Sequence, residues 1–121
     1  RRTSELIKYA ANAFLATKIT FINEMADLCE KVGANVQEVA RGMGLDNRIG
    51  TKFLHAGPGF GGSCFPKDTL ALMQTGQQHG APLQLVEATV RVNEARKAGL
   101  ADRVAAALGG DAAGRRVAVL G

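Results

Sequence analysis

The sequence predicts a mainly α-helical domain built from long helices. Apolar residues recur at the three- and four-residue spacing of a helix along most of the 121 residues. Glycine and proline cluster at a few positions and leave long stretches between them uninterrupted. Hydrophobic residues make up 46% of the chain, which is enough for a packed core and argues against disorder.

The first predicted helix covers residues 3–32. Thr3 or Ser4 can cap its start, and no glycine or proline interrupts it before Gly33. At the usual rise per residue such a helix is roughly 45 Å long. Apolar side chains cover much of its circumference, so it needs partners on several sides. A second subunit is a natural candidate for one of them.

Residues 34–40 are expected to begin a short second helix. Asn35 and Glu38 resemble a capping box at its start, with Asn in the place usually held by Ser or Thr. The glycines of residues 42–44 are expected to end it, and residues 45–50 form a polar loop.

The third helix is predicted over residues 66–78, ending where residues 79–82 break the pattern. A last helix is predicted over residues 83–108, with a bend near Gly99. The positions expected on its buried side are Leu85, Val86, Ala88, Thr89, Val92, Ala95, Leu100, Val104, Ala105 and Leu108.

The end of the chain has a different pattern. Residues 114–121 resemble a buried strand that stops where a turn should begin. A lone strand of this kind cannot pair with itself, and the chain begins at Arg1 without a methionine. We therefore expect a helical domain over residues 1–110 and the truncated start of an α/β domain over residues 111–121, both belonging to a longer protein.

Composition narrows the function classes. The net charge is +4, but the basic residues are scattered and no aromatic residues are interleaved with them, so at most small anionic ligands are expected and no nucleic acid. No apolar run is long enough to cross a membrane. Two cysteines far apart in sequence, without a secretion signal, fit a reducing cytoplasm. No metal site is predicted.

The most informative stretch is the glycine-dense segment of residues 57–68, which delivers Cys64 to about the start of the third helix. Its glycines let a ligand approach the main chain closely. Free N–H groups at a helix start favour a thiolate, and Lys67 adds a nearby cation. Asp68 follows roughly one helical turn later, where it could activate a water. Cys64 is therefore a candidate nucleophile, whereas Cys29 lies in an apolar helix pattern and is expected in the core.

The same stretch contains a misleading pattern. Gly57, Gly59 and Gly62 have the spacing of a dinucleotide-binding loop. That pattern has meaning only between a buried strand and a helix opened by the last glycine. No Val/Ile-rich strand precedes it here, and Ser-Cys-Phe-Pro separates it from the helix, so we reject it.

Two polar residues interrupt the apolar first helix. Lys8 and Asn12 are four residues apart and so share one face. Without further context, a solvated helix edge is the favoured explanation of these two residues. If this face met Cys64, however, the ammonium and the amide would be suitable donors for a developing oxyanion.

Residues 53–68 and residues 5–14 together resemble the UDP-glucose 6-dehydrogenase branch of the UDP-glucose/GDP-mannose dehydrogenase family. The likeness extends from the central helical domain to the first strand of the nucleotide-binding C-terminal domain. It implies an NAD-dependent oxidoreductase that oxidises the C6 alcohol of UDP-glucose to UDP-glucuronate. It also implies a homodimer formed through the central helices.

The resemblance assigns roles to individual residues. Cys64 would be the nucleophile that forms a thiohemiacetal and then a thioester, Lys8 and Asn12 would hold the oxyanion and the water, and Asp68 would assist hydrolysis. Lys67 would lie near the cofactor, and Arg48 would reach into the neighbouring subunit's site. The residues placed against the sugar nucleotide are Phe53, Leu54, His55, Ala56, Gly57 and Gly61.

Relative to that family the N-terminal Rossmann domain and nearly all of the C-terminal domain are missing. The chain by itself is therefore expected to be inactive and to serve as a dimerisation module. Three alternatives stay open: another nucleotide-sugar substrate such as GDP-mannose, a purely structural helical module with an inert Cys64, and a cysteine hydrolase that uses His55 or His79 as its base.

Overall fold

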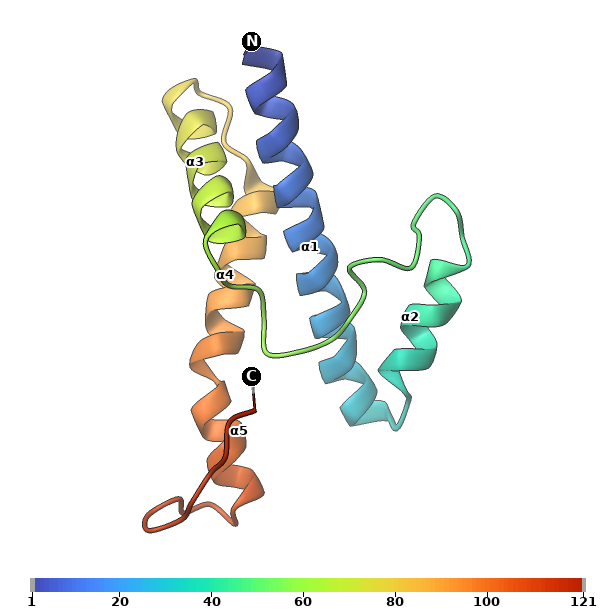
Figure 1. Ribbon diagram of the computed structural model, residues 1–121, viewed down its shortest axis with the longest axis vertical. Helices are drawn as coiled ribbons and strands as arrows, with labels where there is room; N and C mark the ends of the chain where they lie inside the picture. The colour runs from blue at the N-terminus through green and yellow to red at the C-terminus, as the bar shows by residue number, and fades with distance from the viewer. Residues whose placement is uncertain (1, 121) are drawn as a thin grey trace.

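The computed structural model describes residues 2–120 and confirms a mainly helical fold. Figure 1 shows α1 running along the molecule, with α3 and α4 beside it on one side, α2 on the other, and α5 continuing the line of α4. The helices are α1 (Arg2–Val32), α2 (Val36–Gly44), α3 (Cys64–Gln78), α4 (Gln84–Ala98) and α5 (Leu100–Ala107).

The 31-residue helix α1 is the central element, as its uninterrupted sequence predicts. Its inner face carries small residues, and Ala13 and Ala16 are buried, which lets α3 approach closely. Ile22 is fully buried, and Cys29 is in the core as predicted. Among the described residues no helix has the length and apolarity needed to span a membrane.

Helix α2 begins and ends within the segments that the sequence predicts. The side chain of Asn35 accepts hydrogen bonds from the backbone N–H groups of Gln37 and Glu38, which makes Asn35 the N-cap. The helix ends at Gly44, within the segment of residues 42–44 that was expected to end it. Gly44 is buried against Thr51, so tertiary packing outweighs the modest helix penalty of glycine there.

Helix α3 begins at Cys64, two residues before the predicted start at Pro66. Proline is tolerated there because the first N–H groups of a helix have no partner within it. The last predicted helix is interrupted at Gly99, where a bend was expected, and becomes α4 and α5. Leu85, placed on the buried side by its spacing, is 81% exposed, because no described element packs over that part of α4.

Helices α4 and α5, which lie on either side of Gly99, are both tied to α1 by charged side chains. Arg103 of α5 contacts Asp27 and Glu30, and Arg96 of α4 also contacts Asp27. The Arg103 pairs are half exposed and contribute modestly. Residues 115–120 are irregular, with Val119 and Leu120 almost fully exposed, so the C-terminal strand stays a prediction.

The two glycines of α2 allow a test of this packing, because replacing each by alanine should change the free energy of unfolding in opposite directions. A Cβ at Gly44 would lie 2.7 Å from Thr51 Cγ2 and 3.0 Å from its Cα, whereas nothing lies within 4 Å of one at Gly42. Gly42→Ala should raise the free energy of unfolding by about 0.5–1 kcal/mol through lost chain entropy. Gly44→Ala should lower it by about 1–3 kcal/mol because the backbone of Thr51 must move. Denaturant unfolding of both variants checks this; equal effects would contradict the packing.

Candidate functional site

Cys64 is the first residue of α3 and is exposed, in contrast to the buried Cys29. Ser63 precedes it and makes no side-chain cap hydrogen bond, while its Oγ lies 3.8 Å from the Cys64 Sγ. Lys67, one turn further on, is also exposed. The structure therefore places an accessible thiol at the N-terminal end of a helix, which is the setting that the sequence predicts.

Asn12 and Asp68 are brought together from α1 and α3. The Asn12 Nδ2 donates a hydrogen bond of 2.6 Å to the Asp68 Oδ2, and Asp68 is only 3% exposed. Asp68 lies four residues after Cys64 on α3, so both are on one side of that helix. The Asn12 amide has a second N–H, which this contact leaves free to donate elsewhere.

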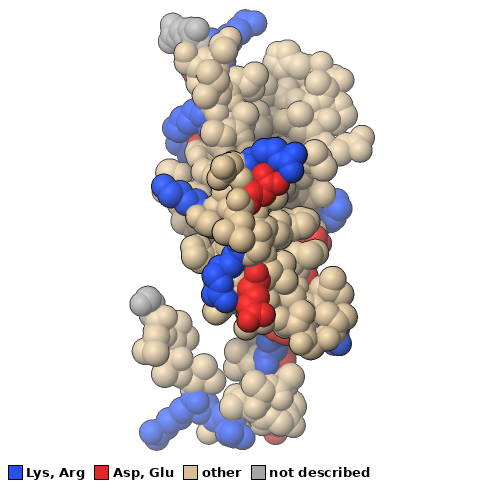
Figure 2. Space-filling model, turned by 90° about the vertical axis from the view of Figure 1, so that its right-hand side faces the viewer, with Lys and Arg blue, Asp and Glu red and all other residues tan. Residues whose placement is uncertain are grey.

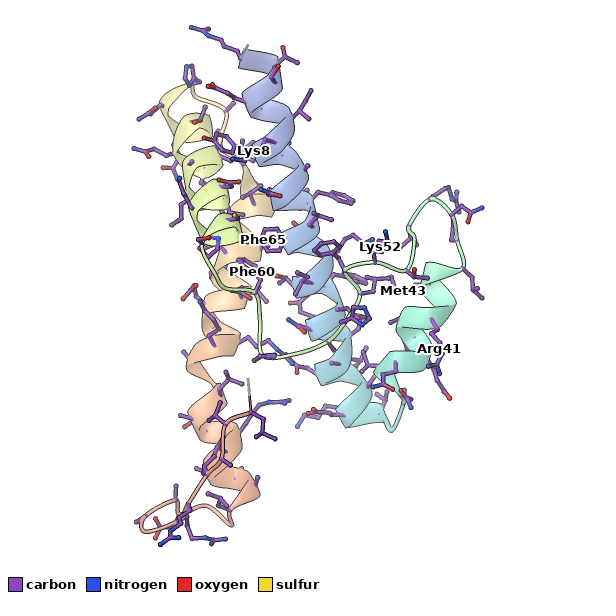
Figure 3. The ribbon with its side chains drawn as sticks, viewed as in Figure 1. Lys8, Arg41, Met43, Lys52, Phe60 and Phe65 are labelled. Atoms are coloured by element: carbon purple, nitrogen blue, oxygen red, sulfur yellow. The ribbon has the colours of Figure 1, made fainter. Side chains whose placement is uncertain are left out.

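Lys8 lies one turn before Asn12 on α1 and is exposed. Figure 3 shows it toward the N-terminal end of α1, at the level where α3 runs alongside. Its Nζ lies 5.9 Å from the centroid of the Tyr9 ring. Lys8 thus belongs to the same end of the helix pair as Asn12, with its ammonium in solvent.

The loop of residues 45–63, which joins α2 to α3 and crosses α1 (Figure 1), is held to the helices by polar contacts at three points. Near its start the Lys18 Nζ donates to the Ile49 carbonyl at 2.9 Å, and two further anchors lie closer to α3. The first, the Gly57 anchor, holds both backbone groups of Gly57. The Gly57 N–H donates to the Asn23 Oδ1 at 2.8 Å, and the Gly57 carbonyl accepts from the Arg96 Nε at 2.7 Å. The second, the Phe60 anchor, is formed by Asn93, whose Oδ1 accepts from the Phe60 N–H at 2.8 Å and whose Nδ2 donates to the Phe60 carbonyl at 3.0 Å.

Sequence reasoning missed Asn23, Asn93 and Arg96. The signal was present, because each is a polar residue inside a helical pattern and the two asparagines occupy positions that face the interior. Both asparagines are almost completely buried, at 2% and 1% exposed. Polar groups buried to this degree are almost always hydrogen-bonded to something specific, here the backbone of the loop.

Three phenylalanines meet where the loop enters α3. The Phe60 and Phe65 rings pack edge to face with centroids 6.1 Å apart, and Phe53 lies 6.1 Å from Phe65 on another side. Figure 3 shows Phe60 and Phe65 close together at this point. Phe53 has a φ of 64°, a strained conformation for a bulky residue that is most often found near functional sites.

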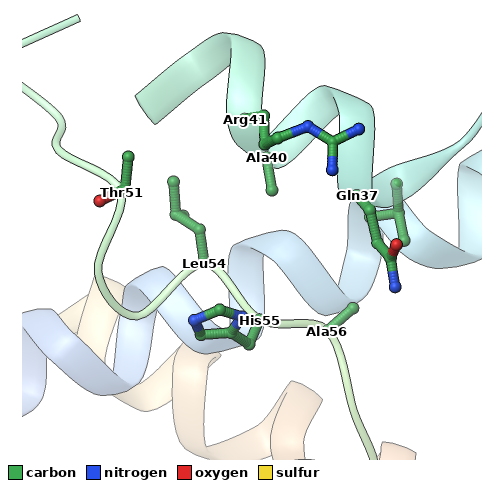
Figure 4. A pocket seen from close by; sticks show the side chains of 8 residues that line it. Gln37, Ala40, Arg41, Thr51, Leu54, His55 and Ala56 are labelled. Atoms are coloured by element: carbon green, nitrogen blue, oxygen red, sulfur yellow. The ribbon is translucent and has the colours of Figure 1, made fainter. Parts of the chain in front are cut away.

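Five of the seven residues predicted to hold a sugar nucleotide line two cavities, whereas Gly61 and Arg48 line neither. One, of about 350 Å³, lies between α2 and the loop; Figure 4 shows Gln37, Arg41, Leu54 and His55 around it. The other, of about 480 Å³, lies against α1. Its lining residues are Ile19, Lys52, Phe53, His55, Gly57, Pro58, Gly59 and Phe60. Cys64 lines neither cavity, so the described chain does not join the thiol and the predicted substrate contacts in one pocket.

The geometry argues against a hydrolase dyad with His79. Cys64 opens the 15-residue helix α3, and His79 caps its other end, where its Nδ1 pairs with the carbonyl of Thr75. At about 1.5 Å per residue the two side chains are separated by roughly 20 Å. His55 lines both cavities, neither of which Cys64 reaches.

Arg48 lies near the start of the loop after α2 and pairs with Asp46 in the same loop. Its guanidinium donates to both carboxylate oxygens of Asp46, with the shortest contact at 2.6 Å, and its side chain is 89% exposed. These side-chain hydrogen bonds, with the Arg48 backbone N–H, lower the pKa of Asp46 below its ordinary value. The same contact raises the pKa of Arg48.

Charge on the face that carries α2 is dispersed. Figure 2 shows acidic and basic side chains interspersed among broad uncharged areas, without a continuous basic stripe on that face. This agrees with the scattered basic residues of the sequence. Within residues 2–120 no group of three or more His, Cys, Asp or Glu side chains is arranged to hold a metal ion.

A family model described as the central domain of the UDP-glucose/GDP-mannose dehydrogenase family matches residues 2–95. The chain belongs to this family. The resemblance drawn from residues 53–68 and 5–14 is therefore confirmed.

Individual members of the family match along the whole chain. It is 73% identical over 121 residues to a UDP-glucose 6-dehydrogenase of Rhizobium meliloti, covering 100% of this chain and 28% of that protein. It is 56% identical over 119 residues to the UDP-glucose 6-dehydrogenase TuaD of Bacillus subtilis, covering 98% and 26%. The chain thus spans roughly a quarter of the length of these family members.

A solved structure supports the helical fold. A UDP-glucose dehydrogenase from the archaeon Pyrobaculum islandicum superposes with a TM-score of 0.84 at 44% sequence identity, covering 89% of this chain and 25% of that one. At this level of identity and similarity the family's central helical domain is the architecture of this chain.

The Asp46–Arg48 pair gives a test of the loop. A carboxyl whose pKa is lowered on folding stabilises the fold above its ordinary value of 3.8, and this contribution is lost as the pH falls through the lower folded value. In an NMR titration the Asp46 carboxyl should therefore titrate below 3.8, and Arg48→Gln should move its midpoint upward. Arg41→Gln, which removes an exposed cation of α2 that does not contact Asp46, is the control and should leave the midpoint in place. An unchanged midpoint in Arg48→Gln would rule out the pairing.

Proposed function

We propose that this chain is the central part of a longer NAD-dependent dehydrogenase that oxidises the C6 alcohol of UDP-glucose to UDP-glucuronate. The observation that carries the proposal is the exposed Cys64 at the start of α3, one helical turn before Asp68 in its part-buried hydrogen bond with Asn12. The 73% identity to a UDP-glucose 6-dehydrogenase supports the choice of substrate over GDP-mannose.

The proposed reaction uses Cys64 as a covalent catalyst. The alcohol is first oxidised to an aldehyde, and the Cys64 thiolate adds to the aldehyde carbon to form a thiohemiacetal. Loss of a second hydride converts this adduct into a thioester, which water hydrolyses to the carboxylate with release of the thiol. The sum is one alcohol, two NAD⁺ and one water giving one carboxylate, two NADH and three protons.

Asn12, Asp68 and Lys8 are proposed to serve the oxygen atoms of these intermediates. The contact with Asp68 fixes the Asn12 amide, so that its second N–H can donate to the thiohemiacetal oxygen or to the attacking water. Asp68 is the candidate group to accept a proton from that water. Lys8, one turn away, adds a positive charge near the developing oxyanion.

The sugar nucleotide is proposed to lie along the segment from Phe53 to Gly61. The two cavities beside residues 53–57 provide concave surface there, and nothing lies within 4 Å of a Cβ placed at Gly61, so the main chain is open to a ligand. Arg48 is exposed and is proposed to reach the site of a neighbouring subunit.

NAD supplies the hydride acceptor in both oxidations. The described residues contain no strand-turn-helix unit of the kind that binds dinucleotides, so we assign its binding mainly to parts of the longer protein outside this chain. Lys67, exposed in the first turn of α3, is the residue of this chain that we place near it. Its ammonium would balance phosphate charge.

Dimerisation through α1 is part of the proposal. Ile7, Phe14, Phe21 and Leu28 recur every seven residues and are between 44% and 67% exposed, although α3 and α4 cover one side of this helix and α2 another. A seven-residue apolar repeat keeps one helix face toward a partner helix. A second copy of α1 is the partner of matching chemistry.

The reaction predicts a fixed yield. The full-length enzyme should form two NADH per UDP-glucose consumed, and Cys64→Ser should lose steady-state turnover by several orders of magnitude, because the aldehyde then has no thiolate to capture it. Cys29→Ala changes the buried cysteine and is the matched control, with the yield preserved. Coupled absorbance and product analysis measure both. A yield of one NADH or none would withdraw the role of Cys64.

The proposed dimer can be tested by the molar mass of a variant in which its apolar surface is disrupted. Replacing Phe14 and Phe21 together by Glu should shift the full-length protein from dimer to monomer in sedimentation equilibrium at micromolar concentration, because charges buried in an apolar seam are not paired. Leu85→Glu, at an exposed apolar site of α4, is the control and should leave the dimer intact. A dimer that survives both Phe changes would locate the interface elsewhere.

A further inference from the structure

The loop of residues 45–63 carries no helix or strand among its residues, yet it ends at the residue whose position matters most, Cys64. An irregular segment of this length needs specific contacts to hold one conformation. The Phe60 anchor is the last contact before α3 that fixes the backbone of this loop through hydrogen bonds. Asn93 makes it with both ends of its amide, and Asn93 is 1% exposed.

The neighbouring glycine is shaped to this contact. Gly59 has a φ of +124°, which side-chain-bearing residues rarely adopt. A Cβ at this position would lie 2.7 Å from the Asn93 Oδ1 and 3.3 Å from the Lys97 Cγ. Glycine therefore lets the chain approach α4 closely enough for Asn93 to bond both backbone groups of the next residue.

A line of contacts leads from Asn93 to the thiol. Asn93 fixes the backbone of Phe60, and Phe60 is 6% exposed. The Phe60 ring packs edge to face on Phe65, with an interplanar angle of 84°. Phe65 is the residue directly after Cys64, so a displacement of Phe60 is transmitted to the first turn of α3.

The Gly57 anchor lies three residues earlier and acts on the other end of the same stretch. Arg96, one turn after Asn93 on α4, bonds the Gly57 carbonyl and is itself held by Asp27 of α1. The Gly57 anchor therefore fixes where the loop leaves α1, while the Phe60 anchor fixes how it enters α3.

We propose that Asn93 is a positioning residue for Cys64, which holds the thiol at the start of α3 in its reactive place through the two hydrogen bonds to Phe60. The catalytic meaning of this role rests on the proposed function. If Asn93 served folding alone, any side chain that shields the loop from water would replace it. Positioning of the thiol requires both of its hydrogen bonds to Phe60.

The test compares three variants of the full-length enzyme. Asn93→Leu keeps the approximate size and removes both hydrogen bonds. Asn93→Asp keeps the acceptor for the Phe60 N–H but, when ionised, offers no donor to the Phe60 carbonyl. Thr89→Val is the matched control, because Thr89 is a buried polar residue one turn earlier on α4 whose Oγ1 pairs with Thr17 and with the Leu85 carbonyl, away from the loop.

Positioning predicts a loss in kcat with little change in KM. For Asn93→Leu we expect kcat for UDP-glucose oxidation to fall by about 10- to 100-fold, as for a small misplacement of a reacting group, while KM stays within about threefold. Thr89→Val should lose stability and keep kcat. If Asn93→Leu keeps kcat within about twofold of the unchanged enzyme, the proposal is overturned.

Asn93→Asp adds a pH signature that a general loss of stability does not produce. A protonated carboxyl accepts and donates as the amide does, and burial beside the Phe60 carbonyl raises the pKa of the introduced carboxyl. The kcat of Asn93→Asp relative to the unchanged enzyme should therefore rise as the pH falls. A ratio that is flat with pH, or falls, would count against the two-bond mechanism.

A readout that needs no turnover separates this proposal from the proposed function. Hydrogen exchange of the peptide spanning residues 57–65 should speed up in Asn93→Leu and stay unchanged in Thr89→Val. The alkylation rate of Cys64, followed on its own peptide, should change only in the Asn93 variants. Absence of NADH from the unchanged enzyme would reject the proposed function but not the positioning role. That role would be rejected if Cys64 is alkylated at the same rate in the Asn93 variants as in Thr89→Val. If Asn93→Leu does not fold, Gly59→Ala takes its place with the same expected losses.

Discussion

The close packing of α1 against α3 and α4 is the constraint on which the rest of the structure depends. Buried alanines at positions 13 and 16 remove the bulk that would hold the helices apart. At that separation short polar side chains reach across: Asn12 meets Asp68, and Thr17 meets Thr89 at 3.0 Å. Larger residues on this face of α1 would break these contacts before they affected helix formation itself.

Among the described residues the interior holds six buried polar residues beside eight buried apolar ones. Next to a small set of apolar side chains it buries two threonines, two asparagines and an aspartate whose hydrogen bonds have defined partners, in addition to Thr20. Such groups stabilise little in net terms but are costly when left unpaired, so they select one alignment of the helices over its neighbours. The Thr20 Oγ1 and the Asn23 Nδ2 lack partners among the described residues and line a cavity of about 310 Å³ with room for bridging water.

Helix α1 is long, yet few of its residues are buried in the core, because much of its outer surface is exposed. One face packs on α3 and α4, another on α2, and a third carries exposed phenylalanine, leucine and isoleucine. An apolar surface of this extent on a single chain marks an interaction site. The loop of residues 45–63 also crosses this helix, so the proposed assembly surface and the candidate site are organised on one element.

Local chemistry in the sequence determined the helices, the Asn35 cap, the burial of Cys29, the exposed helix-start position of Cys64 and the family, because each depends on short-range spacing or on a short motif. Tertiary structure alone decided that Asn12 meets Asp68 and that Asn93 holds Phe60, since these pairs are 56 and 33 residues apart and no local rule sets their distance. It also decided the exposure of Leu85, because helical spacing assigns a face but cannot say whether anything covers it.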